Sequence, residues 1–221
     1  ALLTSTRAFQ RLDHIRQLGG CSVVYPSATH TRREHSLGVC YVAGLIARRL
    51  SLFVNLTDDD ILCVQIAALL HDIGHGPFSH LFESFVNDNI CSGWCHEKMG
   101  IQIVEYLLNS EHIRESIGHH FQGDYATQCI FIKRLILGLH KIEDVPSETG
   151  RNATKRCLFS VVHCNDSGID ADRLDYLQRD NAAVFGASNA FDLKRIVSSM
   201  VVVNGRLVFD ERASNQIFEL F

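Results

Sequence analysis

The sequence predicts a mostly α-helical domain with one small β-hairpin. Apolar residues recur at helical spacing over 35–50, where Leu37, Tyr41 and Leu45 share one side. The dipeptide Asn204-Gly205 separates two apolar runs rich in β-branched residues, which is the strongest short signal for a hairpin near 200–209. Because a single hydrophobic core stays efficient up to roughly 250 residues, the chain of 221 residues fits one domain better than two.

Each further element follows from its own local pattern. Thr57 precedes three consecutive aspartates, which predicts a helix start because side-chain oxygens and acidic groups stabilise helix N-termini. The helix that follows is apolar nearly all round as far as Leu70, so we expect it to be deeply buried. Residues 141–154 predict a surface loop. The remaining helices are expected near 97–109, 127–139, 155–164, 171–180 and 190–199.

The composition places the chain among ordinary globular proteins. Hydrophobic residues make up 46% of it and charged residues 21%, and the formal net charge is -4. This charge gives no electrostatic reason for the whole surface to bind nucleic acid or an anionic membrane, so a nucleic-acid partner is unsupported. The chain begins with Ala1 rather than Met and ends in an apolar helical run, so we expect a single domain over 1–221 that is truncated at both ends.

The cysteines and the hydropathy pattern indicate an intracellular protein. The eight cysteines are scattered without a Cys-x-x-Cys motif, and several stand in apolar runs, where free cysteine packs as a small apolar side chain. A reducing compartment, cytoplasmic or nuclear, is therefore expected. No apolar run approaches the ~18 residues that a membrane span requires, so we expect no membrane partner.

The segment that carries the chemistry is His71-Asp72, at the end of the buried helix. An imidazole nitrogen and a carboxylate oxygen that leave water together both need a partner, and one divalent metal ion satisfies both. Two neighbouring residues cannot complete a coordination shell, so this interpretation requires ligands from distant segments. His35, at the start of the helix over 35–50, is one candidate.

A second source of ligands is the helix expected over 171–180. Asp172, Tyr176 and Asp180 stand at positions i, i+4 and i+8, so their side chains share one stripe of the helix. Two carboxylates and a phenol on one stripe are unusual for plain core packing. This pattern favours a polar site on that face.

Taken in order, these segments resemble the HD-domain superfamily of phosphohydrolases. More narrowly, they are similar to the deoxynucleoside triphosphohydrolases of the SAM-and-HD-domain type. The resemblance covers nearly all of the chain, and the blocks that carry it lie at 9–12 with 17–20, 33–39, 63–67 with 71–80, and 168–172. The resemblance implies an HD-domain helical bundle that hydrolyses deoxynucleoside triphosphates to the deoxynucleoside and inorganic triphosphate.

The resemblance also implies a role for individual residues. It implies a divalent metal ion (Mn, Fe, Zn or Mg) held by His35, His71, Asp72 and Asp172. It implies catalytic roles for His75, His80 and His96, with His80 or His96 as the proton donor and His75 at a phosphate. It places Arg32 and Arg173 at the phosphates, Tyr176 and Asp180 at the sugar, and Gln17 and Leu18 at the sugar and base.

Three positions depart from the family pattern. Glu83 replaces an aspartate that orients the proton-donating histidine, and Arg173 replaces a lysine. Asp13 replaces an arginine of the activating-nucleotide site, which counts against activation by GTP or a deoxynucleotide.

The resemblance further implies a homo-oligomer in the full-length protein. The other histidines, including His30, are expected to be surface or hydrogen-bonded side chains.

Two alternatives stay open at this stage. The chain could be an HD phosphohydrolase for a nucleoside monophosphate or a signalling nucleotide, which the sugar-side matches at Tyr176 and Asp180 disfavour. It could also be an inactive relative that binds nucleotide or nucleic acid as a regulatory module. The presence of all four metal-ligand candidates disfavours that alternative, because buried polar groups are costly without a function.

Overall fold

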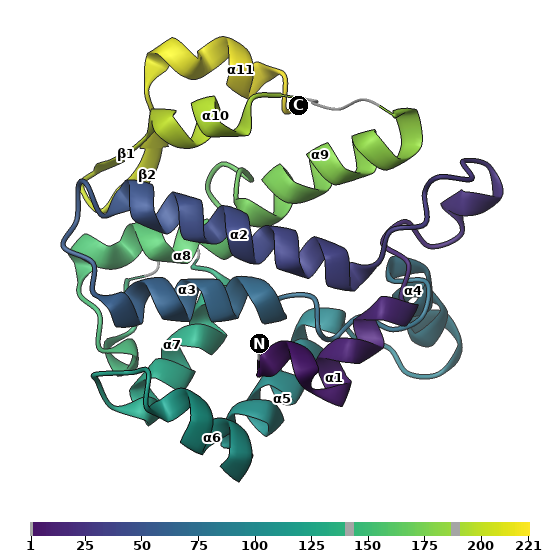
Figure 1. The fold of residues 1–221 in the computed structure, drawn as a ribbon, viewed down its shortest axis with the longest axis horizontal. Helices are drawn as coiled ribbons and strands as arrows, with labels where there is room; N and C mark the ends of the chain where they lie inside the picture. Colours follow the sequence, from purple (N-terminus) through teal and green to yellow (C-terminus); the bar gives the residue numbers. More distant parts are fainter. Residues whose placement is uncertain (1, 140–143, 187–190) are drawn as a thin grey trace.

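The computed structural model describes residues 2–139, 144–186 and 191–221 and is mostly helical, with one two-stranded antiparallel sheet (Figure 1). The fold class predicted from the sequence is therefore confirmed. The longer helices are α2 (Arg32–Leu50), α3 (Asp58–Leu70), α4 (His80–Asn89), α5 (His96–Asn109), α6 (Glu111–Gly118), α7 (Tyr125–Leu137) and α9 (Ala171–Phe185). The shorter elements are α1 (Arg7–Gln10), α8 (Phe159–Val162), α10 (Leu193–Ser199), α11 (Ser214–Phe218), β1 (Met200–Val203) and β2 (Arg206–Phe209).

The predicted helices are present with shifted ends. The helix predicted over 35–50 begins at Arg32, and the one predicted over 171–180 continues to Phe185. The helix predicted over 155–164 is a 3₁₀ segment, Ala153–Leu158, that leads into α8. The loop predicted over 141–154 contains one 3₁₀ turn, Ser147–Thr149, and its first three residues lie outside the described part of the chain.

Side-chain caps fix where the two central helices begin. Thr31 and Glu34 form a reciprocal capping box at the start of α2, and Thr57 and Asp60 form another at the start of α3. The predicted cap at Thr57 is thus confirmed. By contrast, α4 and α6 begin without a side-chain capping bond, and neither helix was predicted from the sequence.

The helices pack around α2, which lies between α3 and α9 (Figure 1). The opposite side of α3 packs against α7, so α3 is covered on several sides and Cys63, Val64 and Leu70 have no exposed surface. The hairpin joins β1 and β2 in the register Met200 to Phe209, as predicted for this segment, and β1 packs on α2. Buried apolar residues along the chain form one hydrophobic cluster.

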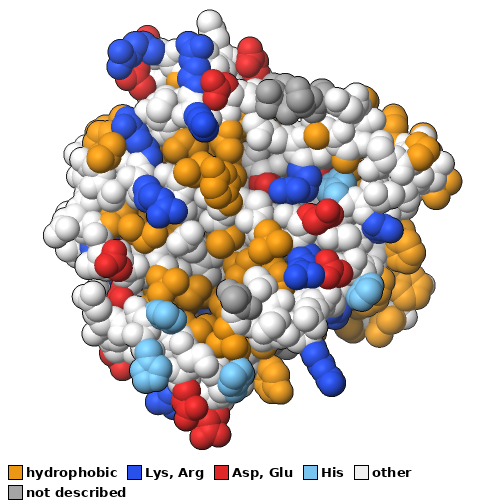
Figure 2. Space-filling view, viewed as in Figure 1, with side chains coloured by type: hydrophobic (Ala, Val, Ile, Leu, Met, Phe, Trp, Pro, Cys, Tyr) orange, Lys and Arg blue, Asp and Glu red, His pale blue; other side chains and the backbone are white. Residues whose placement is uncertain are grey.

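Charged side chains of both signs share one face of the molecule (Figure 2). On the face shown in Figure 2, basic and acidic side chains are interspersed rather than gathered into one basic patch. None of the helices in the described ranges has both the length and the apolar character needed to cross a bilayer.

Candidate functional site

Four side chains from three distant segments converge on one point. His35 lies in the first turn of α2, His71 and Asp72 directly follow α3, and Asp172 lies in the first turn of α9. Asp172 Oδ1 is 2.9 Å from His35 Nε2 and 3.6 Å from His71 Nε2. Asp72 Oδ2 is 3.5 Å from each of these two nitrogens. The structure therefore brings together all four residues that the sequence nominated as metal ligands.

Both histidines direct Nε2 to this point, and their hydrogen bonds favour the tautomer in which Nε2 carries the lone pair that a metal ion binds. His35 Nδ1 lies 2.8 Å from Asp175 Oδ2, and His71 Nδ1 lies 2.8 Å from the carbonyl oxygen of Ala68. Because both partners are acceptors, the ring proton belongs on Nδ1 and the Nε2 lone pair faces the cluster. Both Nε2 atoms are buried without a hydrogen bond. Two neutral imidazoles and two carboxylates with this geometry fit a divalent cation.

The electrostatics of the cluster favour positive charge. Burial opposes protonation of His35, but the nearby carboxylates of Asp172 and Asp175 outweigh burial and raise its pKa to about 9, so a cation that binds here would displace a proton from Nε2. Burial likewise opposes ionisation of Asp72, yet the charges of His71 and Arg32 hold the pKa of Asp72 well below its usual value. The carboxylates therefore stay ionised and attract either protons or a cation.

Arg32 and Ser79 brace the loop that follows His71-Asp72. The buried Arg32 guanidinium donates to Asp72 Oδ2 and, at 3.0 Å, to Ser79 Oγ, and Ser79 Oγ donates to the carbonyl of Arg16 at 3.2 Å. Phe78 and Ser79 both have positive φ angles, 62° and 54°, a conformation that costs of order 1–3 kcal/mol per residue. The hydrogen bonds of Ser79 to Arg32 and Arg16 offset the cost of this backbone conformation. They hold the residue that directly precedes α4, which begins at His80.

The three candidate catalytic histidines form a second cluster beside the first. The rings of His75 and His96 are stacked, with centroids 3.9 Å apart, and His80 lies edge-on at 5.0 Å and 5.3 Å from them. His75 Nε2 lies 3.3 Å from Asp72 Oδ1, which connects the two clusters. His75, His80 and His96 each offer one ring nitrogen that could bind a metal ion, and these three nitrogens lie within 4.8 Å of one another.

The members of this second cluster differ in their surroundings. Burial lowers the pKa of His75 to about 4, so its ring is neutral near pH 7 and can offer a phosphate a hydrogen bond but no charge. Glu83 Oε2 lies 2.6 Å from His96 Nδ1, and the other ring nitrogen of His96, Nε2, lies 3.5 Å from Glu97 Oε1. The longer acid at position 83 therefore does reach the histidine that it was expected to orient.

Asp180, expected at the sugar, and Arg173, expected at a phosphate, already have partners within the protein. Asp180 Oδ1 lies 2.6 Å from His30 Nε2. Arg173 donates to the carbonyl oxygen of Leu220 at 2.9 Å and lies over the ring of Phe221 at 4.4 Å, so it would have to leave Leu220 to bind a phosphate through the same group. The remaining nominated residues, Gln17, Leu18 and Tyr176, are buried or half-buried.

Two functional positions were missed by sequence reasoning. Asp175 stands three residues after Asp172 and orients His35, and its pairing with Arg179 at i+4 is a signal that the sequence does contain. His30 was expected to be a surface or hydrogen-bonded histidine, and it is hydrogen-bonded, to Asp180, with a side chain that is 9% exposed. No local pattern distinguishes His30 from the other histidines.

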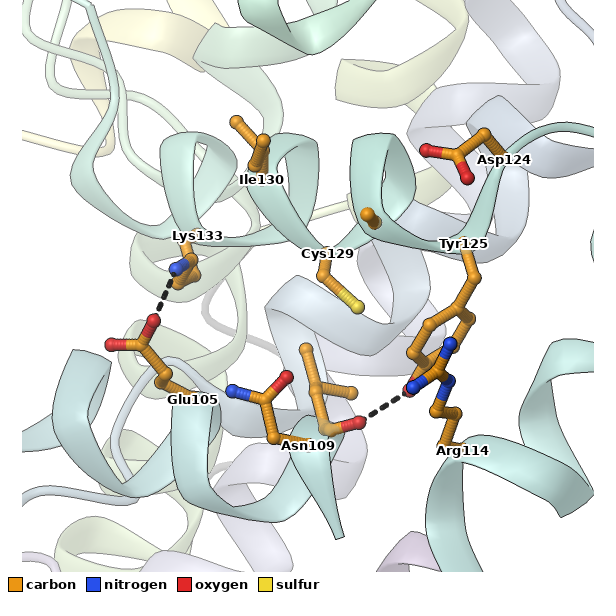
Figure 3. Close-up of a pocket in the computed structure, with 10 residues that line it drawn as sticks. Glu105, Asn109, Arg114, Asp124, Tyr125, Cys129, Ile130 and Lys133 are labelled. Atoms are coloured by element: carbon orange, nitrogen blue, oxygen red, sulfur yellow. Dashed lines mark hydrogen bonds and ion pairs between the residues drawn. The ribbon is translucent and has the colours of Figure 1, made fainter. Parts of the chain in front are cut away.

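A separate pocket of about 290 Å³ lies between α5, α6 and α7 (Figure 3). Two basic and two acidic side chains line it, and Lys133 Nζ pairs with Glu105 Oε1 at 3.0 Å. The Tyr125 hydroxyl donates to the carbonyl oxygen of Leu108 at 2.8 Å. Lys133, Glu105 and Tyr125 therefore have partners, unlike the buried Nε2 atoms of the four-residue cluster, so we place the function at that cluster.

Comparison with known families agrees with this geometry. A family model described as the HD domain matches residues 32–162, which is more than half of the chain. The chain belongs to the HD domain family. The match includes His35, His71 and Asp72 and ends before Asp172.

Curated proteins similar to this HD-domain chain include the deoxynucleoside triphosphate triphosphohydrolase SAMHD1 of Gallus gallus. The two are 40% identical over 208 residues, which is 88% of this chain and 33% of that protein. The SAMHD1 homolog of Dictyostelium discoideum is 33% identical over 221 residues, covering 98% of this chain and 39% of that protein. A putative HD domain-containing protein, L394, of Acanthamoeba polyphaga mimivirus is 28% identical, covering 99% and 47%. The chain thus spans between a third and a half of these relatives.

Proposed function

We propose that residues 1–221 form a single HD phosphohydrolase domain that hydrolyses deoxynucleoside triphosphates to deoxynucleoside and inorganic triphosphate. The observation that carries the proposal is the convergence of His35, His71, Asp72 and Asp172, with both histidine Nε2 atoms buried and unbonded. The similarity to proteins named deoxynucleoside triphosphate triphosphohydrolase supports the substrate class.

The four residues would hold one divalent cation, and the donor set suits Mn, Fe, Zn or Mg. A bound cation of this kind supplies Lewis-acid polarisation of a phosphoryl oxygen and makes hydroxide available near neutral pH. Arg32, which already contacts Asp72, would hold an oxygen of the phosphate that is attacked. Because its Nη1 and Nε already donate to Asp72 and Ser79, it would reach that oxygen through its remaining N–H groups.

The leaving group of the proposed reaction is the 5′-oxygen of the nucleoside, which needs a proton. We assign this proton to His80 or His96 and give His75 a hydrogen-bonding role at the phosphate. His96 is the better-oriented donor, since Glu83 fixes its ring at Nδ1. Tyr176 and Asp180 would contact the sugar, and Gln17 and Leu18 the sugar and base.

Product analysis tests the reaction class. The full-length protein with Mn²⁺ should convert dGTP or dATP to the nucleoside and triphosphate, as separated by chromatography. Orthophosphate or pyrophosphate as the product would instead indicate another HD phosphohydrolase. No turnover of any nucleotide would favour the regulatory relative. Parallel assays with added GTP would test an activator, and light scattering would test the proposed homo-oligomer.

A substitution of one ligand tests the site. Asp172→Ala should abolish turnover and metal binding, while the folded state persists, because Asp172 is 38% exposed in its side chain and no core packing is lost. The matched control is Asp166→Ala, which changes an exposed aspartate outside the cluster. Full activity in the Asp172 variant would remove this residue from the site.

A further inference from the structure

The contact between His30 and Asp180 joins two elements that are far apart in the sequence. His30 lies in the loop before α2, and its Nε2 is 2.6 Å from Oδ1 of Asp180 on α9. The two side chains are 9% and 23% exposed, so little water competes for this contact. An ionised carboxylate only accepts hydrogen bonds, so His30 is the donor, and such charge-assisted bonds are short and strong. His30 therefore fixes the direction in which the Asp180 carboxylate points.

The loop that carries His30 is itself attached to α9. Ser27 Oγ donates to the carbonyl oxygen of Ala183, and the ring of Tyr25 meets the ring of Phe185 edge-on with centroids 6.2 Å apart. These contacts lie one turn beyond Asp180 on the same helix. The histidine is thus held in register with α9 by more than its own hydrogen bond.

His30 and a residue paired with its backbone each have a buried side-chain atom without a hydrogen-bond partner in the described structure. One is His30 Nδ1 and the other is Gln17 Oε1. The two residues are adjacent, because the backbone N–H of Gln17 donates to the carbonyl oxygen of His30 at 3.1 Å. Buried polar groups are normally hydrogen-bonded, so unbonded ones indicate a place where a ligand brings polar groups of its own.

The position of Asp180 along α9 suits a sugar. It stands eight residues after Asp172, which is about 12 Å along a helix. That separation leaves room for a phosphoryl group and a sugar between the proposed metal ligand and the Asp180 carboxylate.

We propose that His30 is a positioning residue of the sugar subsite, where it holds Asp180 to receive the 3′-hydroxyl of the deoxyribose. The inference rests on the proposed function, because it takes a deoxynucleoside triphosphate as the ligand. It adds a specific mechanism of selection: the enzyme distinguishes a 3′-hydroxyl from a 3′-hydrogen through a carboxylate that His30 aligns.

The test compares His30→Ala with His30→Gln in the full-length protein. Glutamine can place its amide N–H where His30 Nε2–H lies, so it retains the donor to Asp180, whereas alanine removes it. The KM for a dNTP should rise by about 10- to 100-fold in His30→Ala, the value of a hydrogen bond to a charged group. The kcat should change little, and KM for the 2′,3′-dideoxy analogue should stay at the wild-type value. His30→Gln should restore most of the preference for the 3′-hydroxyl.

A binding measurement separates failure of this inference from failure of the proposed function. Wild-type protein that turns over no dNTP counts against the proposed reaction alone. Calorimetry with Mn²⁺ and α,β-methylene dNTP, with and without the 3′-hydroxyl, still measures the preference in each variant. Loss of that preference in His30→Ala, and no further loss on adding Asp180→Asn, supports the proposal. A wild-type preference that survives in His30→Ala, the absence of any preference in the wild type, or equal weakening of both ligands overturns it.

Discussion

The carboxylate of Asp175 should control how tightly the metal centre binds its cation. Asp175 is 8% exposed, and its Oδ2 lies 2.8 Å from His35 Nδ1. Both of its oxygens accept hydrogen bonds from Arg179, at 2.8 Å and 2.9 Å. This arrangement keeps the ring proton on Nδ1 and makes His35 Nε2 a better electron-pair donor. Asp175→Asn keeps the shape of the side chain and removes its charge.

The expected loss of metal affinity follows from the burial of the contact between His35 and Asp175. Removal of such a partner typically weakens metal binding by about 10- to 100-fold, or roughly 1.4 to 2.7 kcal/mol. We expect the upper part of this range, because His35 is fully buried and water cannot take the place of the carboxylate. A Cβ added at Gly38 would lie 1.9 Å from Asp175 Oδ1, which shows how closely α2 approaches α9 here. The folding cost should be small, since the Arg179 side chain is 30% exposed and can be hydrated.

Calorimetric titration with Mn²⁺ measures the effect, and thermal unfolding in a chelator shows whether the fold is retained. The matched control is Asp210→Asn, which removes the same kind of aspartate–arginine pair at the surface, where Arg212 is 89% exposed. Wild-type affinity for Mn²⁺ in Asp175→Asn would refute the reasoning. So would an equal loss of affinity in Asp210→Asn.

Two further predictions concern stability and proton transfer. Asp60→Asn should lower the free energy of unfolding by about 3–5 kcal/mol at pH 7, as measured in urea, because the fully buried Asp60 is 2.9 Å from Arg151 Nε and 2.6 Å from Lys155 Nζ. Burial alone would raise the pKa of Asp60, but its bonds from Lys155, the Thr57 backbone and Arg151 lower it. The stabilisation is therefore present above the unfolded pKa of about 4 and is lost as pH falls through the lower folded pKa. Glu83→Ala should reduce kcat by up to about 10²-fold with little change in KM, since it releases His96 from its orienting bond.

The predictions for Asp60 and Glu83 each have a control measurement. The difference in unfolding free energy between wild type and Asp60→Asn should shrink as pH falls below the unfolded pKa of about 4 and through the lower folded pKa of Asp60. A difference that stays constant over this fall in pH would show that the ion pairs are not its source. For Glu83, the isosteric Glu83→Gln keeps an acceptor for His96 and should lose less activity than the alanine variant. A larger rise in KM than fall in kcat would assign Glu83 to binding instead.

The sequence by itself determined the elements whose signals are local. The cap at Thr57, the helical spacing of apolar residues and the turn at Asn204-Gly205 all depend on residues within a few positions of each other. The helices α4 and α6 were not predicted, although serines of the type that can cap a helix, Ser79 and Ser110, stand directly before them. The candidate ligands could be nominated because His71-Asp72 is a local pair and because the order of blocks resembles a known family.

The tertiary structure alone decided which atoms meet. Asp175 reaches His35 across 140 positions, and His30 reaches Asp180 across 150, so neither contact leaves a periodic trace in the sequence. Burial also gave two histidines different surroundings: the ring of His75 is neutral and enclosed, whereas the ring of His30 is buried and paired with a carboxylate. The pKa of a side chain and the acceptor that fixes its tautomer depend on the solvent and charges around it, and packing between distant helices sets both.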